Sequence, residues 1–270
     1  MVSLTELDYE TLSALLLNFS TCSSLFSLAL TCRTLRNTII PKFLYARPTL
    51  PDNERRIASF CNTILAQDAA AGDAVRHLAI PFGYASLPWG QALAKMPSLC
   101  SVDFDLEDVV EVNPSLPKSI SAMTHLTSLS LGFLPGDDVL EFLRDLRPLQ
   151  CLVANGSPSY HITSESPLGD LLLRSRDTLV ELQLNSFTWN FDPRSASDCG
   201  DRSFIWPRIH TLLIGMAYAN YSFSLPLAFP STRHLVLPPS QEAAPDHPVL
   251  LSSISSFFPT SSLSKDRGDM

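Results

Sequence analysis

The chain has 270 residues, 45% of them hydrophobic and 17% charged, and this composition excludes an intrinsically disordered protein. Lys and Arg, 19 in all, are outnumbered by 27 Asp and Glu, and the formal net charge of −8 argues against a nucleic-acid-binding surface. The length suits one extended domain or two small ones.

The start of the chain predicts an intracellular protein. Residues 1–8 carry acidic side chains instead of the basic residues and apolar core of a secretory signal. The longest leucine run, residues 15–17, is far too short to cross a bilayer, so we expect no membrane association. We therefore expect the protein in the cytoplasm or the nucleus.

Residues 7–45 are expected to form a separate helical unit. Apolar side chains at helical spacing predict a first helix, and they are Leu12, Leu15, Leu16 and Phe19. Residues 20–24 interrupt this pattern, and a second helical stretch then runs from Leu25 to Ile39, before Pro41.

A unit of this size is expected to carry more apolar side chains than it can bury by itself. The residues that would form an exposed patch are Leu12, Leu16, Leu25, Leu28, Cys32 and Leu35. Two interpretations stay open. In the first, the rest of the chain covers this patch and the unit is only an N-terminal cap. In the second, another protein covers it.

After a connection at residues 46–53, stiffened by two prolines, a helix is predicted over residues 54–67. The chain then repeats one short pattern, clearest in residues 126–131, where leucines occupy the first, fourth and sixth positions of a strand. The pattern recurs at residues 75–80, 99–104, 126–131, 149–154, 179–184, 209–214 and 232–237.

The fourth positions of these segments are Leu78, Val102, Leu129, Leu152, Leu182, Leu212 and Leu235. They are separated by 24, 27, 23, 30, 30 and 23 residues, close to the roughly 20–29 residues of a leucine-rich repeat. The spacing predicts an α/β solenoid with parallel strands on its concave side and helices and loops on its convex side. An ordinary α/β domain with coincidental spacing is the alternative.

Helices are expected between the strands at residues 89–96, 137–146 and 168–179, and a polar surface loop at residues 190–202. The solenoid is expected to end at residue 238. Residues 239–270 are rich in Pro and Ser and supply no obvious terminal cap. The sequence leaves open whether Phe257 and Phe258 fold back over the last strand or the tail is disordered or shortened.

Outward positions on the strands predict a small, polar and mildly acidic face that could bind a partner protein. The candidate residues are Ser101, Asp103, Asp105, Ser128, Ser130, Glu181 and Gln183. A solvated surface without a partner is the alternative.

No catalytic, cofactor or metal site is expected. The sequence has no phosphate-binding glycine loop, zinc helix or nucleophile elbow. His77, His210 and His234 fall on different strands, whereas a metal ion needs three or four ligands within about 2.0–2.3 Å. The six cysteines are scattered singly, which favours reduced thiols over disulfides or a zinc site.

One stretch of the helical unit is more specific than helical periodicity requires. Residues 28–35 are Leu-Ala-Leu-Thr-Cys-Arg-Thr-Leu. Together with residues 7–12, Leu16, Phe19 and residues 40–45, they resemble the F-box of fungal F-box proteins, whose pattern is Leu-x-Leu-Thr-Cys-Arg-x-Leu. This chain departs from the family at residues 7 and 8, where Leu-Asp replaces the usual Leu-Pro.

The resemblance implies an F-box-like domain at residues 1–46, a leucine-rich-repeat solenoid at 47–238 and a tail at 239–270. It implies that the helical unit binds a Skp-type adaptor through Leu7, Leu12, Leu16, Phe19, Leu25, Leu28, Cys32 and Leu35. The implied function is substrate recognition in an SCF-type cullin-RING ubiquitin ligase, with an unknown target protein on the solenoid. A leucine-rich-repeat interaction scaffold with no ligase role is the alternative.

Overall fold

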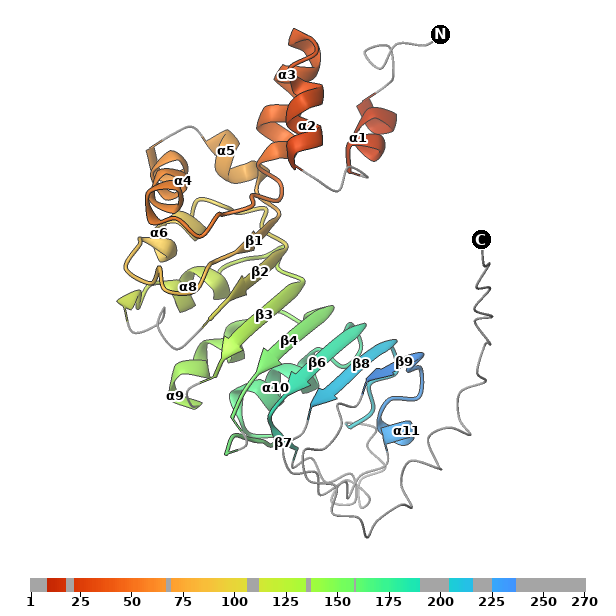
Figure 1. The fold of residues 1–270 in the computed structure, drawn as a ribbon. Coiled ribbons are helices and arrows are strands. Elements are labelled where there is room, and N and C mark those ends of the chain that lie inside the picture. The colour runs from red at the N-terminus through yellow and green to blue at the C-terminus, as the bar shows by residue number, and fades with distance from the viewer. Residues whose placement is uncertain are drawn as a thin grey trace, which may run out of the picture.

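The computed structural model describes residues 9–17, 22–66, 69–105, 112–134, 137–157, 159–189, 204–215 and 225–236. Within them, a single open sheet of seven parallel strands forms the body of the protein, and helices follow one of its faces (Figure 1). The mixed α/β architecture with parallel strands is therefore confirmed. The expected loop at residues 190–202 and the tail at 239–270 lie outside the described residues.

The strands of the main sheet follow one another in chain order, so each new strand is added at the same edge. They are β1 (His77–Ala79), β2 (Ser101–Phe104), β3 (Ser128–Phe133), β4 (Cys151–Asn155), β6 (Glu181–Asn185), β8 (Thr211–Gly215) and β9 (His234–Val236). All seven predicted strands are present. A second sheet pairs β5 (His161–Ile162) with β7 (Thr188–Trp189); neither strand was predicted, because two residues show no periodicity.

The predicted anchor positions lie in one continuous row across the main sheet. Leu78 pairs with Val102, Val102 with Leu129, and the register continues to Leu235 without a slip at this row. Six of the seven anchors are buried, while Leu235 on the last strand is half-buried. Because side chains alternate along a strand, the neighbouring positions face the other way and leave that face open.

A second repeat is visible in the backbone just before each strand. The Arg76 carbonyl, for example, accepts the N–H groups of Cys100 and Ser101 at 2.8 and 3.0 Å. The same two-donor arrangement recurs, and the accepting carbonyl groups are those of Ala46, Arg76, Cys100, Thr127, Gln150, Val180 and His210. These bonds satisfy backbone groups that lie outside the strand ladders. We call this series the carbonyl ladder.

Helices connect the strands, and α4, α6, α8, α9 and α10 follow one another along the same side of the sheet (Figure 1). The elements are α4 (Glu54–Ala66), α5 (Ala69–Ala74), α6 (Trp89–Leu93), α8 (Leu116–Ser121), α9 (Asp137–Leu140), the 3-10 helix η3 (Glu141–Asp145), α10 (Pro167–Arg174) and α11 (Leu225–Ala228). Helices are thus confirmed in all four predicted segments. The segment at residues 137–146 divides into α9 and η3, and α10 stops at Arg174 instead of reaching Leu179.

Polar groups join successive helices of this layer. Arg174 on α10 donates from Nη2 to the Leu143 carbonyl of η3 at 2.8 Å and forms an ion pair with Asp170 at 2.9 Å. Trp206 is fully buried, donates from Nε1 to the Leu172 carbonyl at 2.9 Å and stacks on Phe229. These bonds satisfy buried polar atoms that the packing of the layers would otherwise leave unpaired.

The N-terminal unit contains α1 (Tyr9–Leu17), α2 (Cys22–Ala29), α3 (Arg33–Ile39) and the π-helix η2 (Ile40–Leu44). The prediction of one helical stretch from Leu25 to Ile39 is wrong, because the chain turns between α2 and α3. Thr31 Oγ1 donates to the Leu28 carbonyl at 2.7 Å, and Cys32 is extended, with φ −154° and ψ 162°. A side-chain hydroxyl that bonds to the backbone competes with helix continuation.

Two separate apolar cores result. The larger core contains buried residues from Ile57 to Phe229, between the sheet and its helices. The smaller core lies within the N-terminal unit and extends from Leu12 to Ile39. Within the described part of the chain, no helix has both the length and the apolar character needed to cross a membrane.

Candidate functional site

Four of the side chains expected to face an adaptor lie instead in the core of the N-terminal unit. Leu12, Leu16, Leu25 and Leu35 are 8%, 1%, 7% and 4% exposed. The expectation that the unit cannot bury them is wrong. Ala29 and Ile39 complete this core, and partly buried side chains surround it; they are Leu28, Ile40, Phe43 and Leu44.

The other expected adaptor residues are placed differently. Leu28 is half-buried against the small core. Cys32 is exposed, but its Sγ accepts the Leu35 N–H at 3.5 Å as the N-cap of α3. Leu7 and Phe19 lie outside the described residues. The motif at residues 28–35 therefore builds the turn between two helices and the beginning of the second.

Three other apolar side chains of this unit face outward. Leu15 on α1 is 44% exposed, Phe26 on α2 is 49% exposed, and Leu30 after α2 is 62% exposed. Phe26 and Leu30 are four residues apart and therefore share one face, and the Leu30 N–H bonds to the Phe26 carbonyl at 3.1 Å. Sequence reasoning missed this pair, because the stripes of Leu25 with Ala29 and of Phe26 with Leu30 are equally periodic.

The open face of the main sheet carries the other candidate residues. We define a first row by the register of Ser101, Ser128, Cys151, Glu181 and Thr211, with His77 and His234 at its ends. A second row, two residues further along each strand, contains Ala79, Asp103, Ser130, Val153, Gln183, Leu213 and Val236. Six of the seven predicted residues thus lie in two adjacent rows, and Asp105 follows directly after β2.

Polar side chains on this face bond to one another. Gln183 donates from Nε2 to Glu181 Oε1 at 2.6 Å, and Asn185 donates from Nδ2 to Asn155 Oδ1 at 2.7 Å. Gly132 on β3 makes room for Asp105: a Cβ at Gly132 would lie 2.9 Å from Asp105 Cγ.

The prediction of a small, polar face is wrong for part of the second row, from β4 to β9. Val153 and Leu213 are half-buried in the second row, and Val236 is 49% exposed at its end. The sequence signal was present, since Leu213 lies between the buried Leu212 and Ile214 and must therefore point to the open face.

Two titratable groups on the first row, His77 and Cys151, have shifted pKa values. Burial, aided by the charges of Arg47 and Arg76, lowers the pKa of His77. Burial raises the pKa of the Cys151 thiol, and the negative charge of Glu181 adds to this increase.

The described histidines do not converge. His77 and His234 lie six strands apart, about 29 Å at about 4.8 Å per strand. Among the described residues, no group of three or more His, Cys, Asp or Glu side chains could hold a metal ion.

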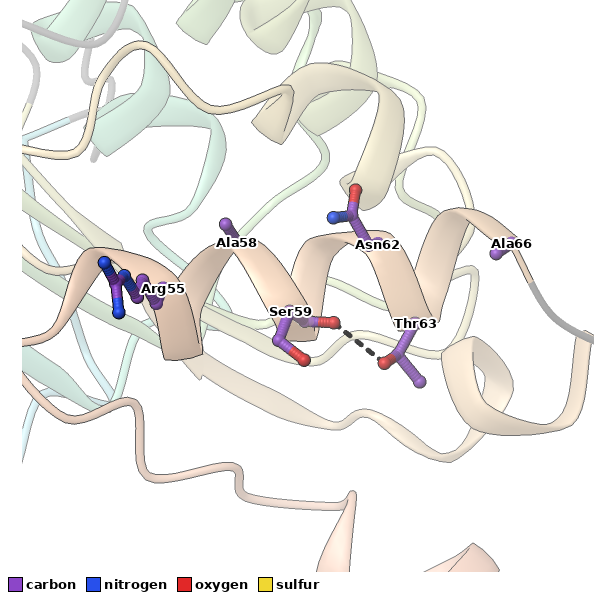
Figure 2. Close-up of a pocket in the computed structure, with 6 residues that line it drawn as sticks. All are labelled: Arg55, Ala58, Ser59, Asn62, Thr63 and Ala66. Carbon is purple, nitrogen blue, oxygen red and sulfur yellow. Dashed lines mark hydrogen bonds between the residues drawn. The ribbon is translucent and has the colours of Figure 1, made fainter.

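A shallow hollow lies along the outer surface of α4 (Figure 2). Its lining comes from this one helix and contains Arg55, Ala58, Ser59, Asn62, Thr63 and Ala66. Thr63 Oγ1 donates to the Ser59 carbonyl at 2.8 Å, so this hydroxyl is already bonded within the helix. The lining offers no pair of groups suited to acid–base or nucleophilic chemistry.

The two surfaces that remain are the apolar side chains of the N-terminal helices and the open face of the sheet. Comparison of the chain with models of protein families, with curated proteins and with solved structures finds no match to any of them.

Proposed function

We propose that the chain is the substrate-recognition subunit of an SCF-type cullin-RING ubiquitin ligase, built as an F-box-like unit followed by a leucine-rich-repeat solenoid. In this proposal the N-terminal helices bind a Skp-type adaptor and the open face of the sheet binds a target protein. The chain then performs no bond chemistry and contributes by holding the target near the ligase.

Two repeating features support the solenoid. The anchor row from Leu78 to Leu235 runs through every strand of the main sheet. The carbonyl ladder repeats the same spacing in the backbone, from Ala46 to His210. A fold in which each unit contacts chiefly its neighbours in sequence is typical of repeat proteins. The open face is then the concave face of the solenoid.

The observation that carries the adaptor proposal is the exposed apolar pair on the N-terminal unit. Phe26 on α2 and Leu30 in the turn that follows it lie on one side and remain exposed, whereas Leu25 and Ala29 are buried on the other side. Exposed large apolar side chains that lie together favour a protein-binding surface. Adaptor binding is therefore assigned to Phe26 and Leu30, with Leu15, instead of to the self-buried leucines.

One observation favours the alternative, an interaction scaffold with no ligase role. The Ala46 carbonyl accepts the N–H groups of Arg76 and His77 at 2.9 and 3.0 Å, so the chain leaving the helical unit forms the first step of the carbonyl ladder. The backbone that follows η2 therefore lies against the start of β1, where an N-terminal cap would join the sheet.

Co-purification with a Skp-type adaptor separates the two functions. We expect the full chain to retain the adaptor, and the double substitution Phe26→Asp with Leu30→Asp to abolish retention, because charged side chains cannot enter an apolar interface without a desolvation cost. Both positions are exposed, so the variant is expected to keep the thermal stability of the wild type.

The matched control is Phe82→Asp, which places the same charge at a phenylalanine that is 68% exposed on the body of the protein. It should retain the adaptor. Failure of the wild type to retain the adaptor would refute the ligase proposal and leave the scaffold. Retention by the Phe26 and Leu30 double variant would refute the assignment of adaptor binding to this pair.

A further inference from the structure

The two ends of the open face of the sheet differ in chemical character: one is acidic and the other is apolar. Near β2 it carries Asp103 in the second row and Asp105 just after it, and Asp103 has no ion pair within the described part of the chain. Neither the first nor the second row contains a Lys or Arg residue. Toward β8 and β9 the second row ends in Leu213 and Val236.

At the acidic end, the backbone of β3 lies close to Asp105. The close approach of Gly132 and Asp105 means that any other residue at 132 would press on this carboxylate. Gly132 itself has no side chain to cover it. Asp103 is exposed and two residues away on the same face. Both carboxylates are therefore positioned on the face of the sheet, as a docked cation would require.

Positive charge lies near the β1 side of this end. Arg47 and Arg76 are close enough to His77 to lower its pKa, which places positive charge beside the first row at β1. A cationic side chain of a partner would be repelled there and attracted towards Asp103 and Asp105. Glu181, the other carboxylate of the two rows, already accepts a hydrogen bond from Gln183. The charges thus favour a basic group at Asp103 and Asp105.

The apolar end favours a different kind of side chain. Val236 is 49% exposed on the last strand of the main sheet, and Leu213 is half-buried beside it. Covering these side chains with another apolar side chain removes apolar surface from water. The amides of Gln183 and Asn185 lie between the two ends but already bond to neighbouring side chains.

The geometry fixes the distance between the two positions. Four strand spacings separate β2 from β8 and five separate β2 from β9, which is about 19–24 Å at about 4.8 Å per strand. An extended chain advances about 3.3 Å per residue, so two side chains of one segment reach both ends when they are about six or seven residues apart.

We propose that the target segment is an extended polypeptide that crosses the strands, with a Lys or Arg at Asp103 and Asp105 and an aliphatic or aromatic residue six or seven positions away, at Leu213 and Val236. This assignment rests on the proposed function for the role of the open face and specifies the class of target.

Selection of a random display library of 15-residue peptides on the full-length chain tests this proposal. Enriched peptides are expected to pair a basic residue with an apolar residue at a separation of six or seven, in either order. An enriched peptide, labelled with a fluorophore, should bind Asp103→Asn about two- to fivefold more weakly than the wild type, the loss expected for one exposed ion pair.

Two further variants make the test specific. Asp103→Lys should reverse the preference, so that the same peptide with Glu in place of its basic residue binds better than the original. Leu213→Ser should relax selection at the apolar position and leave the basic position selected. Asp145→Asn, an exposed acidic residue of η3 in the helical layer, is the matched control and should bind as the wild type does.

No enrichment, enrichment without the spacing, or equal binding by Asp103→Asn and Asp145→Asn would overturn the proposal. The adaptor assay keeps this result distinct from the proposed function. Loss of adaptor retention with peptide selection intact refutes only the ligase role, and loss of peptide selection with adaptor retention intact refutes only this assignment.

Discussion

His77 is placed where its charged form is unfavourable. It begins β1 at the end of the first row, half-buried, with the guanidinium groups of Arg47 and Arg76 nearby. Burial removes water from the imidazolium and the two cations repel it, so the pKa falls below its ordinary value of 6.5. The unfolded chain is free of both effects and takes up the proton at a higher pH than the folded chain.

This difference predicts a pH dependence of stability. As the pH falls through 6.5 and below, the unfolded state binds more protons than the folded state, so the free energy of unfolding decreases. His77→Gln removes this contribution. Thermal unfolding between pH 8 and pH 5 should therefore show a smaller loss of Tm for the variant than for the wild type. Identical losses of Tm in the two proteins would contradict this account of His77.

At the scale of single elements, Cys32 shows how an unusual residue begins a helix. Its extended backbone and its Sγ acceptor satisfy the Leu35 N–H, one of the donors that a helix leaves unpaired at its N-terminus. A thiol sulfur is a weak hydrogen-bond acceptor, whereas a hydroxyl oxygen of nearly the same shape is a strong one. The N-cap of α3 is therefore weaker than it could be.

Cys32→Ser is expected to stabilise α3, and Cys32→Ala to destabilise it, with a difference of about 0.5–2 kcal/mol between the two variants. Hydrogen exchange of the Leu35 and Arg36 amides is the measurement. The amide protons of the serine variant should exchange more slowly than those of the wild type, and those of the alanine variant faster. Equal exchange in the serine and alanine variants would show that the side chain of residue 32 does not cap the helix.

Strands were more predictable than helices for a physical reason. Side chains along a strand alternate between only two faces. Once the repeat is recognised, the burial of Leu129 therefore implies that Ser130 points outward. A helical stretch offers several faces, and the sequence alone did not decide between Leu25 and Phe26. The turn at Thr31 was missed because apolar periodicity continues across it. Short elements such as α8 depend on packing between layers, which leaves little local pattern.

The same contrast holds for the candidate site. Positions on the open face were predicted from alternation. The exposed patch of the N-terminal unit was predicted from its size and apolar content, and the burial of Leu12, Leu16, Leu25 and Leu35 shows that this expectation was wrong. Small units can bury more than their size suggests when several short helices converge on one core. Which leucines remain exposed is a property of that packing, and Leu30 illustrates it.

At the scale of the whole molecule, each strand is sustained by its neighbours. Leu129 lies near the middle of the anchor row, fully buried, with Val102 on one side and Leu152 on the other. Its loss would therefore weaken the packing of three successive repeats. Domains are stable by only about 5–15 kcal/mol, so one such cavity is a large part of the total.

Leu129→Ala is expected to lower the free energy of unfolding by about 3–5 kcal/mol, because it leaves a cavity in a tightly packed row. Ser130→Ala, one residue along the same strand and on the open face, should change it by less than about 0.5 kcal/mol. Urea denaturation followed by circular dichroism measures both. Similar midpoints for the two variants would contradict the division of the strand into a buried and an open side.

The hydrogen bonds to the Ala46 carbonyl affect how a target bound to the sheet would be oriented. Because this carbonyl accepts the backbone N–H groups of Arg76 and His77, it ties the end of the N-terminal unit directly to the start of β1. In a ligase of the kind proposed, this tie would restrict the directions in which a captured target is presented. Those lysines of the target that face the transferring enzyme would be modified with ubiquitin in preference to the others. The hydrogen bonds at Ala46 would then affect which lysines are modified, while the open face determines which target is bound.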